Sequence, residues 1–210
     1  MRLILASASP RRAQILSEMG LRFIVAPTEV EEWHDARADP ESLVRHNCNL
    51  KARAGVRLYP AKPVLAADST VCIHGRNLGK PVDMEEARCM LRELSGRTHT
   101  VYTGVSLFYR RSGIEDTLCV RSEVTFNRLD EREIEAYFEI VDPLDKAGAY
   151  GIQDGRAMII QSVAGSVSNV MGLPIAETED LLRRHAIFDQ LHPDGATPAV
   201  DCDMSGQIRR

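Results

Sequence analysis

The stretch HTVYTGVSLFYRRSGIEDTLCVRSEVTFN, residues 99–127, sets the architecture expected for this chain. It holds two long runs rich in β-branched and aromatic side chains, separated by the turn sequence RRSG at 110–113. Such runs favour strands, and a short connection containing glycine predicts that the strands pair antiparallel. We therefore expect a long two-stranded ribbon in the second half of the chain.

Shorter strands and helices alternate on either side of this ribbon. Strands are predicted at 2–6, 21–27, 63–75 (with a polar break at 68–70 and a hairpin turn at 74–77) and 157–163, and a loop at 164–174. Helices are predicted from Ser9 to Gly20, Asp39 to about Gly55, Asp83 to Gly96, from Asp130, and from Pro174 to about His185, on the basis of capping residues and apolar spacing. This mixture indicates an α/β protein with a mixed sheet, bent into two lobes with a cleft between them.

Composition places the chain among soluble globular proteins. Of its 210 residues, 44% are apolar and 27% charged, and the net charge of −4 disfavours binding to nucleic acid. Five scattered cysteines without a C-x-x-C pair predict reduced thiols, and no apolar run reaches membrane-spanning length. We expect a cytoplasmic protein with one domain over 1–188 and a disordered polar tail over 189–210.

The sequence SASPRR at 7–12 begins a predicted helix with two arginines. A helix N-terminus already carries partial positive charge, so these arginines favour a negative partner nearby. Backbone N–H groups, the hydroxyls of Ser7 and Ser9, and the guanidinium groups of Arg11 and Arg12 would together form a compact phosphate receptor. The alternative is a serine cap followed by arginines on the outer face of the helix.

Three further segments carry candidate chemistry. Asp68 interrupts an apolar strand beside Ser69 and is suited to hold a divalent cation or to take a proton from water, or else to act as a turn aspartate. Lys80 precedes a proline and would project from a loop, and Gln153 in a glycine-rich loop offers a donor and an acceptor to a base edge. With the acidic pair Glu31 and Glu32, these residues indicate an enzyme acting on a phosphate ester or anhydride, with Mg²⁺.

Six motifs resemble those of a known family. They are LASASPRR (5–12), AADSTV (66–71), LGKPVD (78–83), LSGRTHTVYTGVSL (94–107), LDKAGAYGIQ (144–153) and GSVSNVMGLPI (165–175). Their order and spacing resemble the Maf family of nucleoside triphosphate pyrophosphatases from Arg2 to about Leu182. The resemblance implies an elongated mixed sheet flanked by helices, similar to the fold of the inosine triphosphate pyrophosphatases, and is compatible with a homodimer.

The resemblance also assigns roles to residues. It implies hydrolysis of the α–β anhydride of a nucleoside triphosphate with Mg²⁺ or Mn²⁺, and Asp68 as the proton acceptor. The substrate-binding positions are Ser7, Ser9, Arg11, Arg12, Lys51, Ser69, Lys80 and Gln153, and the metal positions are Asp68 with Glu31 or Glu32.

Within the family, this chain resembles the branch that acts on dTTP and UTP, including modified pyrimidine nucleotides. The branch for N7-methyl-GTP tends to carry tryptophan where this chain has Arg11. Two positions depart from the family pattern: Ser69 replaces the commoner threonine, and Leu50 replaces an acidic residue. The alternatives are the methyl-GTP branch and a nucleotide-binding regulator of cell division without turnover, for which a carboxylate at position 68 has no use.

Overall fold

A mixed sheet runs through the protein. The computed structural model describes residues 1–153 and 155–192, and within them a seven-stranded sheet has the order β2-β1-β3-β5-β6-β7, with β4 paired on β3. The strands are β1 (Leu3–Leu5), β2 (Phe23–Val25), β3 (Val64–Ile73), β4 (Arg76–Leu78), β5 (Thr98–Tyr109), β6 (Ile114–Phe126) and β7 (Ile160–Ala164). β1 pairs parallel with β2 and β3, whereas the other neighbours pair antiparallel. The predicted mixed α/β class is confirmed.

Strands β5 and β6 form the long ribbon that the sequence predicts. Their register runs without a break from Thr98 opposite Thr125 to Tyr109 opposite Ile114. A short 3-10 turn, η1 (Arg110–Ser112), closes the ribbon, and Gly113 follows with a φ of 65°, a left-handed conformation that glycine adopts without strain.

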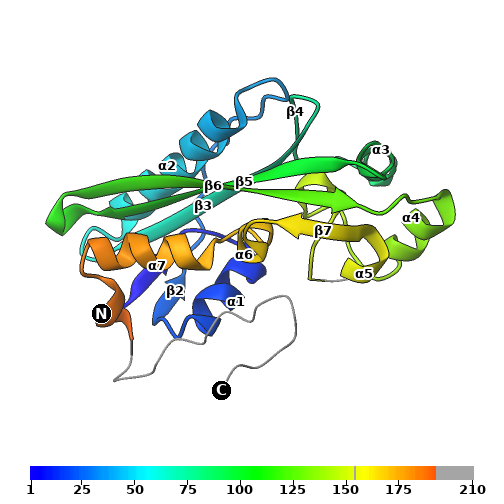
Figure 1. Cartoon of the computed structure of the whole chain (residues 1–210). Helices are drawn as coiled ribbons and strands as arrows, with labels where there is room; N and C mark the ends of the chain where they lie inside the picture. The colour runs from blue at the N-terminus through cyan, green and yellow to red at the C-terminus, as the bar shows by residue number, and fades with distance from the viewer. Residues whose placement is uncertain (154, 193–210) are drawn as a thin grey trace, which may run out of the picture.

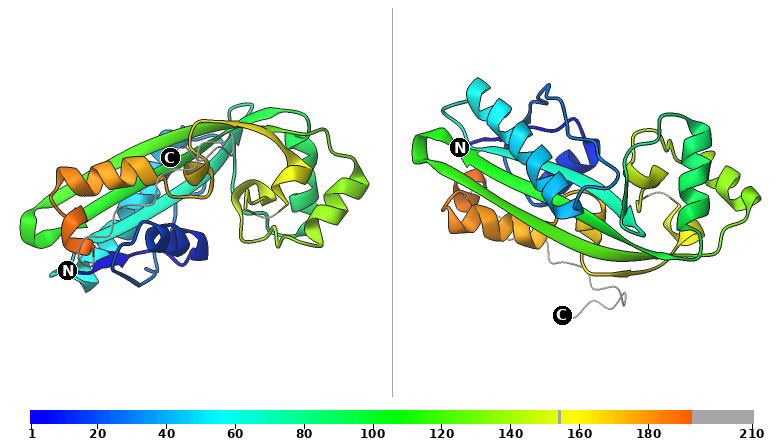
Figure 2. Two further views of the ribbon diagram at one scale, coloured as in Figure 1. Left: turned by 60° about the horizontal axis from the view of Figure 1, so that its bottom comes forward. Right: turned by 90° about the horizontal axis from the view of Figure 1, so that it is seen from above.

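Helices cover both faces of the sheet (Figure 1). They are α1 (Pro10–Glu18), α2 (Pro40–Leu58), α3 (Met84–Leu94), α4 (Glu131–Phe138), the 3-10 turn η2 (Ala147–Ala149), α5 (Arg156–Ile159), α6 (Val167–Val170), α7 (Ile175–Arg184) and α8 (Phe188–Leu191). Figure 1 shows α2 on one face of β3, β5 and β6, and α1, α6 and α7 on the other. Helices α3, α4 and α5 lie together at the end of the ribbon opposite the turn η1. This arrangement is visible in Figure 1 and in both views of Figure 2.

Alternation along β3 distributes its side chains among three apolar clusters. Leu65 and Ala67 pack with α1 and α7, whereas Val64 and Ala66 pack on the opposite face with α2. Farther along the strand, Val71 and Ile73 join a third cluster with α3 and α4. We call the first two clusters the large lobe and the third the small lobe. Residues 68–70 of β3 therefore lie where the lobes meet.

The structure corrects three local predictions. The polar triplet 68–70 does not break the strand, because Asp68 pairs with Gly104 of β5 in a continuous β3. Residues 156–159 form the helical turn α5 rather than a strand, and the strand begins at Ile160. The loop predicted at 164–174 contains α6, whose first turn is capped by the Ser166 hydroxyl accepting from the N–H of Asn169.

The predicted tail begins too early. Helix α8 continues to Leu191, whose side chain is fully buried in the large lobe, so residues 189–191 belong to the fold. This segment has too few apolar residues to be recognised from sequence, and it is held by buried Leu191 together with backbone hydrogen bonds from Met1 and Arg22. Residues 193–210 lie outside the described part of the chain. In the part described, no helix combines the length and apolar character that crossing a bilayer requires.

Candidate functional site

A cleft between the two lobes opens beside the centre of β3. On one edge, β3 pairs with β1 at Val64 and Leu65 and with β4 at Val71–Ile73, so in the described chain its edge between these pairings has no strand partner. A cleft of about 1130 Å³ lies there, lined from both lobes. The carboxyl end of β1 leads directly to its rim and into α1. Open α/β sheets bind ligands in crevices of this kind, at strand ends and helix N-termini.

Asp68 lies at the base of the cleft, on the face of β3 that packs against α2. Its Oδ1 accepts from Lys51 Nζ at 2.7 Å, and its Oδ2 accepts from Asn47 Nδ2 at 3.1 Å. Lys51 Nζ also lies 3.1 Å from Glu32 Oε2. An ammonium between two carboxylates thus offsets the cost of burying Asp68, whose side chain is 12% exposed.

Helix α2 reaches Asp68 because a glycine lies opposite it. In an antiparallel pair, directly opposed residues project from the same face, and Asp68 opposes Gly104. A Cβ at Gly104 would lie 2.7 Å from the carbonyl oxygen of Val44 on α2. The absence of a side chain at position 104 therefore sets how closely α2, with Asn47 and Lys51, approaches the carboxylate.

Ser69 projects from the opposite face of β3, toward α1. Its hydroxyl accepts from Arg12 Nη2 at 3.1 Å and lies 2.9 Å from Thr103 Oγ1. Arg12 also donates from Nη1 to Ser7 Oγ at 3.1 Å and from Nε to the carbonyl of Gly172 at 2.8 Å. Burial lowers the pKa of the Arg12 guanidinium, and the nearby Asp68 opposes that shift. Three of its five N–H groups are engaged, which leaves two for a ligand.

Arg11 contacts the small lobe across the cleft. Its Nη1 lies 3.3 Å from Oδ2 of Asp145, on the loop before η2. Lys146 Nζ also contacts Asp145 and donates to the carbonyl of Asp142 at 2.6 Å. Arg11 therefore already has a negative partner within the protein, the carboxylate of Asp145, beside the other cationic side chains that line the cleft.

Three more of the predicted residues line the cleft. Ser9 is the N-cap residue of α1, but its side chain makes no capping bond, so the hydroxyl does not cap the helix as expected. Ser7 is buried, and its hydroxyl accepts from the backbone N–H of Ser9 at 3.2 Å. Lys80 follows β4 on the small-lobe rim, is exposed, and forms no ion pair with any residue of the described chain.

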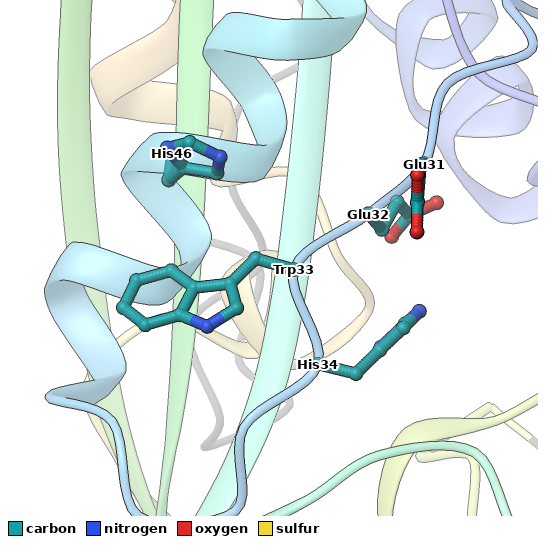
Figure 3. A pocket seen from close by; sticks show the side chains of 5 residues that line it. All are labelled: Glu31, Glu32, Trp33, His34 and His46. Carbon is teal, nitrogen blue, oxygen red and sulfur yellow. The ribbon is translucent and has the colours of Figure 1, made fainter.

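Two predicted residues lie away from the base of the cleft. Glu31 lines a shallower pocket of about 710 Å³ beside the cleft, together with Glu32, Trp33, His34 and His46 (Figure 3). Glu32 also lines the main cleft, whereas Glu31 does not. Gln153 is exposed, does not line the cleft, and donates to Gln14 Oε1 on α1 at 3.3 Å. The binding roles of Glu31 and Gln153 stay predictions.

Sequence reasoning missed Asn47 and Asp145. Asn47 stands one helical turn before Lys51 on the apolar face of α2, and an amide in that position is a signal that it contacts something polar inside the protein. Asp145 stands in a predicted glycine-rich loop, and no local pattern indicates that it pairs with Arg11, 134 residues away.

The carboxylates at the base of the cleft provide some, but not all, of the ligands that a hard divalent cation requires. Within the described residues no group of three or more histidine, cysteine or acidic side chains converges as a complete metal site. Asp68 and Glu32 do converge, since both contact the same Lys51 nitrogen. Mg²⁺ is commonly held by one or two carboxylates together with substrate phosphates, so these two residues fit such a site when a phosphorylated ligand completes it.

One cleft is thus lined by the buried carboxylate of Asp68 and by four cationic side chains, those of Arg11, Arg12, Lys51 and Lys80, a combination that suits a small anionic ligand. The chain belongs to the Maf family, since the model of the Maf-like proteins matches residues 2–185.

Two similar proteins align with this chain over most of its length and over most of their own. The dTTP/UTP pyrophosphatase of Myxococcus xanthus is 47% identical over 182 residues, which are 87% of this chain and 91% of that protein. The dTTP/UTP pyrophosphatase of Anaeromyxobacter dehalogenans is 48% identical over 185 residues, covering 87% and 93%. Among solved structures, the Staphylococcus aureus Ham1 protein matches with a TM-score of 0.44 and 14% identity, over 60% of this chain and 72% of that one.

Proposed function

We propose that this protein hydrolyses dTTP and UTP to the nucleoside monophosphate and pyrophosphate. The observation that carries the proposal is the placement of Asp68 at the base of the cleft, among the cationic side chains of Arg11, Arg12 and Lys80. Relatives at 47% and 48% identity that carry the name dTTP/UTP pyrophosphatase support the choice of substrates.

In this proposal Asp68 accepts the proton of the attacking water. Each of its oxygens accepts one hydrogen bond from the protein, and a carboxylate has about four lone-pair positions, so a water can also be bound. The water oxygen bonds to the α-phosphorus while the bond from that phosphorus to the bridging oxygen breaks. Pyrophosphate leaves with the bridging oxygen, and the water proton passes to Asp68.

Positive side chains stabilise the charge that develops on the leaving pyrophosphate. Arg12 is fixed by three hydrogen bonds and presents its remaining N–H groups without reorganisation, which favours electrostatic stabilisation of a transition state. Lys80 and Arg11 face the same cleft from opposite lobes. A Mg²⁺ or Mn²⁺ ion held by Asp68 and Glu32 would add charge neutralisation at the phosphates. The hydroxyls of Ser7, Ser9 and Ser69 belong to the same phosphate-facing surface.

The proposal places the reaction in the cytoplasm, with a nucleoside triphosphate as the partner and neither nucleic acid nor membrane required. The four cysteines of the described chain, Cys48, Cys72, Cys89 and Cys119, are free thiols, which supports a reducing compartment. A homodimer stays part of the proposal and requires a measurement of mass in solution.

The test is release of pyrophosphate from dTTP, UTP, CTP, GTP and N7-methyl-GTP in the presence of Mg²⁺. We expect the highest turnover with dTTP and UTP, and no turnover in Asp68→Asn. Asp116→Asn is the matched control, because Asp116 pairs with His185 and Arg184 outside the cleft lining. Preferred turnover of N7-methyl-GTP would favour the other branch, and tight nucleotide binding without turnover would favour a regulator.

A further inference from the structure

Two parallel bridges connect the loop after β2 to Asp68. In the first, Lys51 contacts both Glu32 and Asp68. In the second, the side chain of Asn47 contacts both the backbone of Trp33 and Asp68. Lys51 follows Asn47 by one helical turn on α2, so one face of this helix holds two consecutive loop residues and both oxygens of the carboxylate.

Every polar group of the Asn47 side chain that can bond is used. Its Oδ1 accepts from the N–H of Trp33 at 2.8 Å, and its Nδ2 donates to the carbonyl of Trp33 at 3.1 Å and to Asp68 Oδ2 at 3.1 Å. The residue is 2% exposed. A buried amide with both donors and its acceptor engaged is rigid, because losing any one contact leaves a polar group without a partner.

From this geometry we propose that Asn47 is a positioning residue, which fixes the orientation of Asp68 and couples it to the loop that carries Glu32 and Trp33. This inference rests on the proposed function. The Lys51 bridge carries a positive charge and the Asn47 bridge is neutral, so the two respond differently when a phosphate group enters the cleft. Lys51 is cationic, so phosphate groups entering the cleft compete with Asp68 for its ammonium. The neutral amide of Asn47 attracts phosphate far less, so it keeps its hold on the carboxylate when Lys51 turns to the substrate.

The chain provides a spectroscopic reporter of the same bridge. Trp33 is the only tryptophan in the sequence, and the residue is 39% exposed at the junction of the cleft and the pocket shown in Figure 3. Its ring lies edge-to-face against His46, with centroids 5.6 Å apart. Intrinsic fluorescence therefore reports on the loop directly, whether or not the protein turns over a nucleotide.

The decisive variant is Asn47→Leu, which keeps the size of the side chain and removes all three hydrogen bonds. We expect kcat for dTTP to fall by at least about tenfold with little change in KM, because the phosphate-binding side chains are untouched while the carboxylate is misplaced. We also expect a red shift and stronger acrylamide quenching of Trp33 fluorescence. Equal kcat, or a change confined to KM, would overturn the proposal.

The matched control is Asn49→Leu on the same helix. Asn49 accepts hydrogen bonds from Ser106 at 3.0 Å and Thr117 at 2.7 Å, and it does not line the cleft. This control loses partly buried hydrogen bonds without touching Asp68 or Trp33. We expect it to lower the melting temperature while kcat and Trp33 fluorescence stay as in the unaltered protein. An equal fall in kcat in both variants would reduce Asn47 to a general stabilising role and overturn the inference.

A second variant, Asn47→Asp, covers the case in which Asn47→Leu does not fold. It retains an acceptor for the Trp33 N–H but cannot donate when ionised, and it adds a negative charge beside Asp68. We expect kcat to fall by more than in Asn47→Leu and the fluorescence to shift by less. If the unaltered protein shows no turnover of any nucleotide, the proposed function fails, and the fluorescence comparison alone still shows whether Asn47 holds the loop.

Discussion

Lys51 Nζ lies 2.7 Å from Oδ1 of Asp68, although 17 residues separate them in the sequence. The same nitrogen contacts Glu32, so a single ammonium lies between two carboxylates at the base of the cleft. Before substrate arrives, these three charged side chains already interact, so removing any one of them affects the other two.

Replacing Lys51 by methionine is expected to destabilise the fold. The variant leaves Asp68, whose side chain is 12% exposed, without its ion-pair partner. Loss of one partner of a buried pair costs about 3 kcal/mol, so the free energy of unfolding in urea should fall by about that amount at neutral pH. The matched control is Lys62→Met, because Lys62 does not line the cleft. Equal stability of Lys51→Met and the unaltered protein would contradict the prediction.

Replacing Gly104 by alanine is expected to move α2 away from β5. The new methyl group would lie 2.7 Å from the carbonyl oxygen of Val44, a backbone atom that moves only with its helix. Overpacking of this kind costs about 1–3 kcal/mol. Turnover should fall together with the melting temperature, because Asn47 and Lys51 travel with α2. Gly113→Ala, in the turn that closes the ribbon beside η1, meets no neighbouring atom but strains a left-handed backbone, so it is expected to lower the melting temperature while turnover stays unchanged.

Replacing Lys80 by alanine is expected to affect the substrate and leave the fold unchanged. Lys80 is exposed and pairs with no residue of the described chain, so no contact within the protein is lost. A charge-assisted contact with a phosphate is worth about 1.5–3 kcal/mol, which predicts a fall in kcat/KM of about tenfold to a hundredfold. Calorimetric melting should show the same transition as in the unaltered protein. A large drop in melting temperature would contradict the prediction.

Acid is expected to destabilise the small lobe through His99. Burial lowers the pKa of His99 from 6.5 to about 4, and its Nδ1 has no hydrogen-bond partner in the described structure. Between these values the unfolded chain binds more protons than the folded chain, so the free energy of unfolding falls as pH decreases from 6.5 to about 4. The loss amounts to about 3 kcal/mol.

Urea unfolding at several pH values between 7.5 and 4 measures this slope. In His99→Gln, which keeps a polar side chain beside the Tyr150 hydroxyl, the part of the slope due to His99 should disappear. Identical slopes in the two proteins would exclude His99 as the group responsible.

Local sequence predicted the parts of the site that local chemistry determines. The run from Ser7 to Arg12 is contiguous, and its placement at a strand end before a helix follows from the pattern of apolar residues, proline and hydroxyls. The ribbon of β5 and β6 was equally clear, because two strands joined by a short turn need no distant contact to be recognised.

The features of the site that sequence reasoning missed depend on contacts between residues that are far apart in the chain. The polar residues 68–70 indicate a break in a strand only if they face water, and α2 covers Asp68 instead. That covering depends on Gly104, which belongs to another strand. The pairing of Arg11 with Asp145 likewise depends on how the two lobes meet, and no local pattern carries that information.

The two lobes share the strands β3, β5 and β6 (Figure 1). On β5, Val101 belongs to the core of the small lobe and Val105 to that of the large lobe, with Thr103 and Gly104 between them in an unbroken hydrogen-bonded ladder. Any change in the width of the cleft must therefore twist or bend continuous strands, since along these strands no hinge separates the lobes. Because bending hydrogen-bonded strands costs free energy, we expect the width of the cleft to change only by small amounts. Because the same strands run through both cores, we also expect the two lobes to unfold together in one cooperative transition.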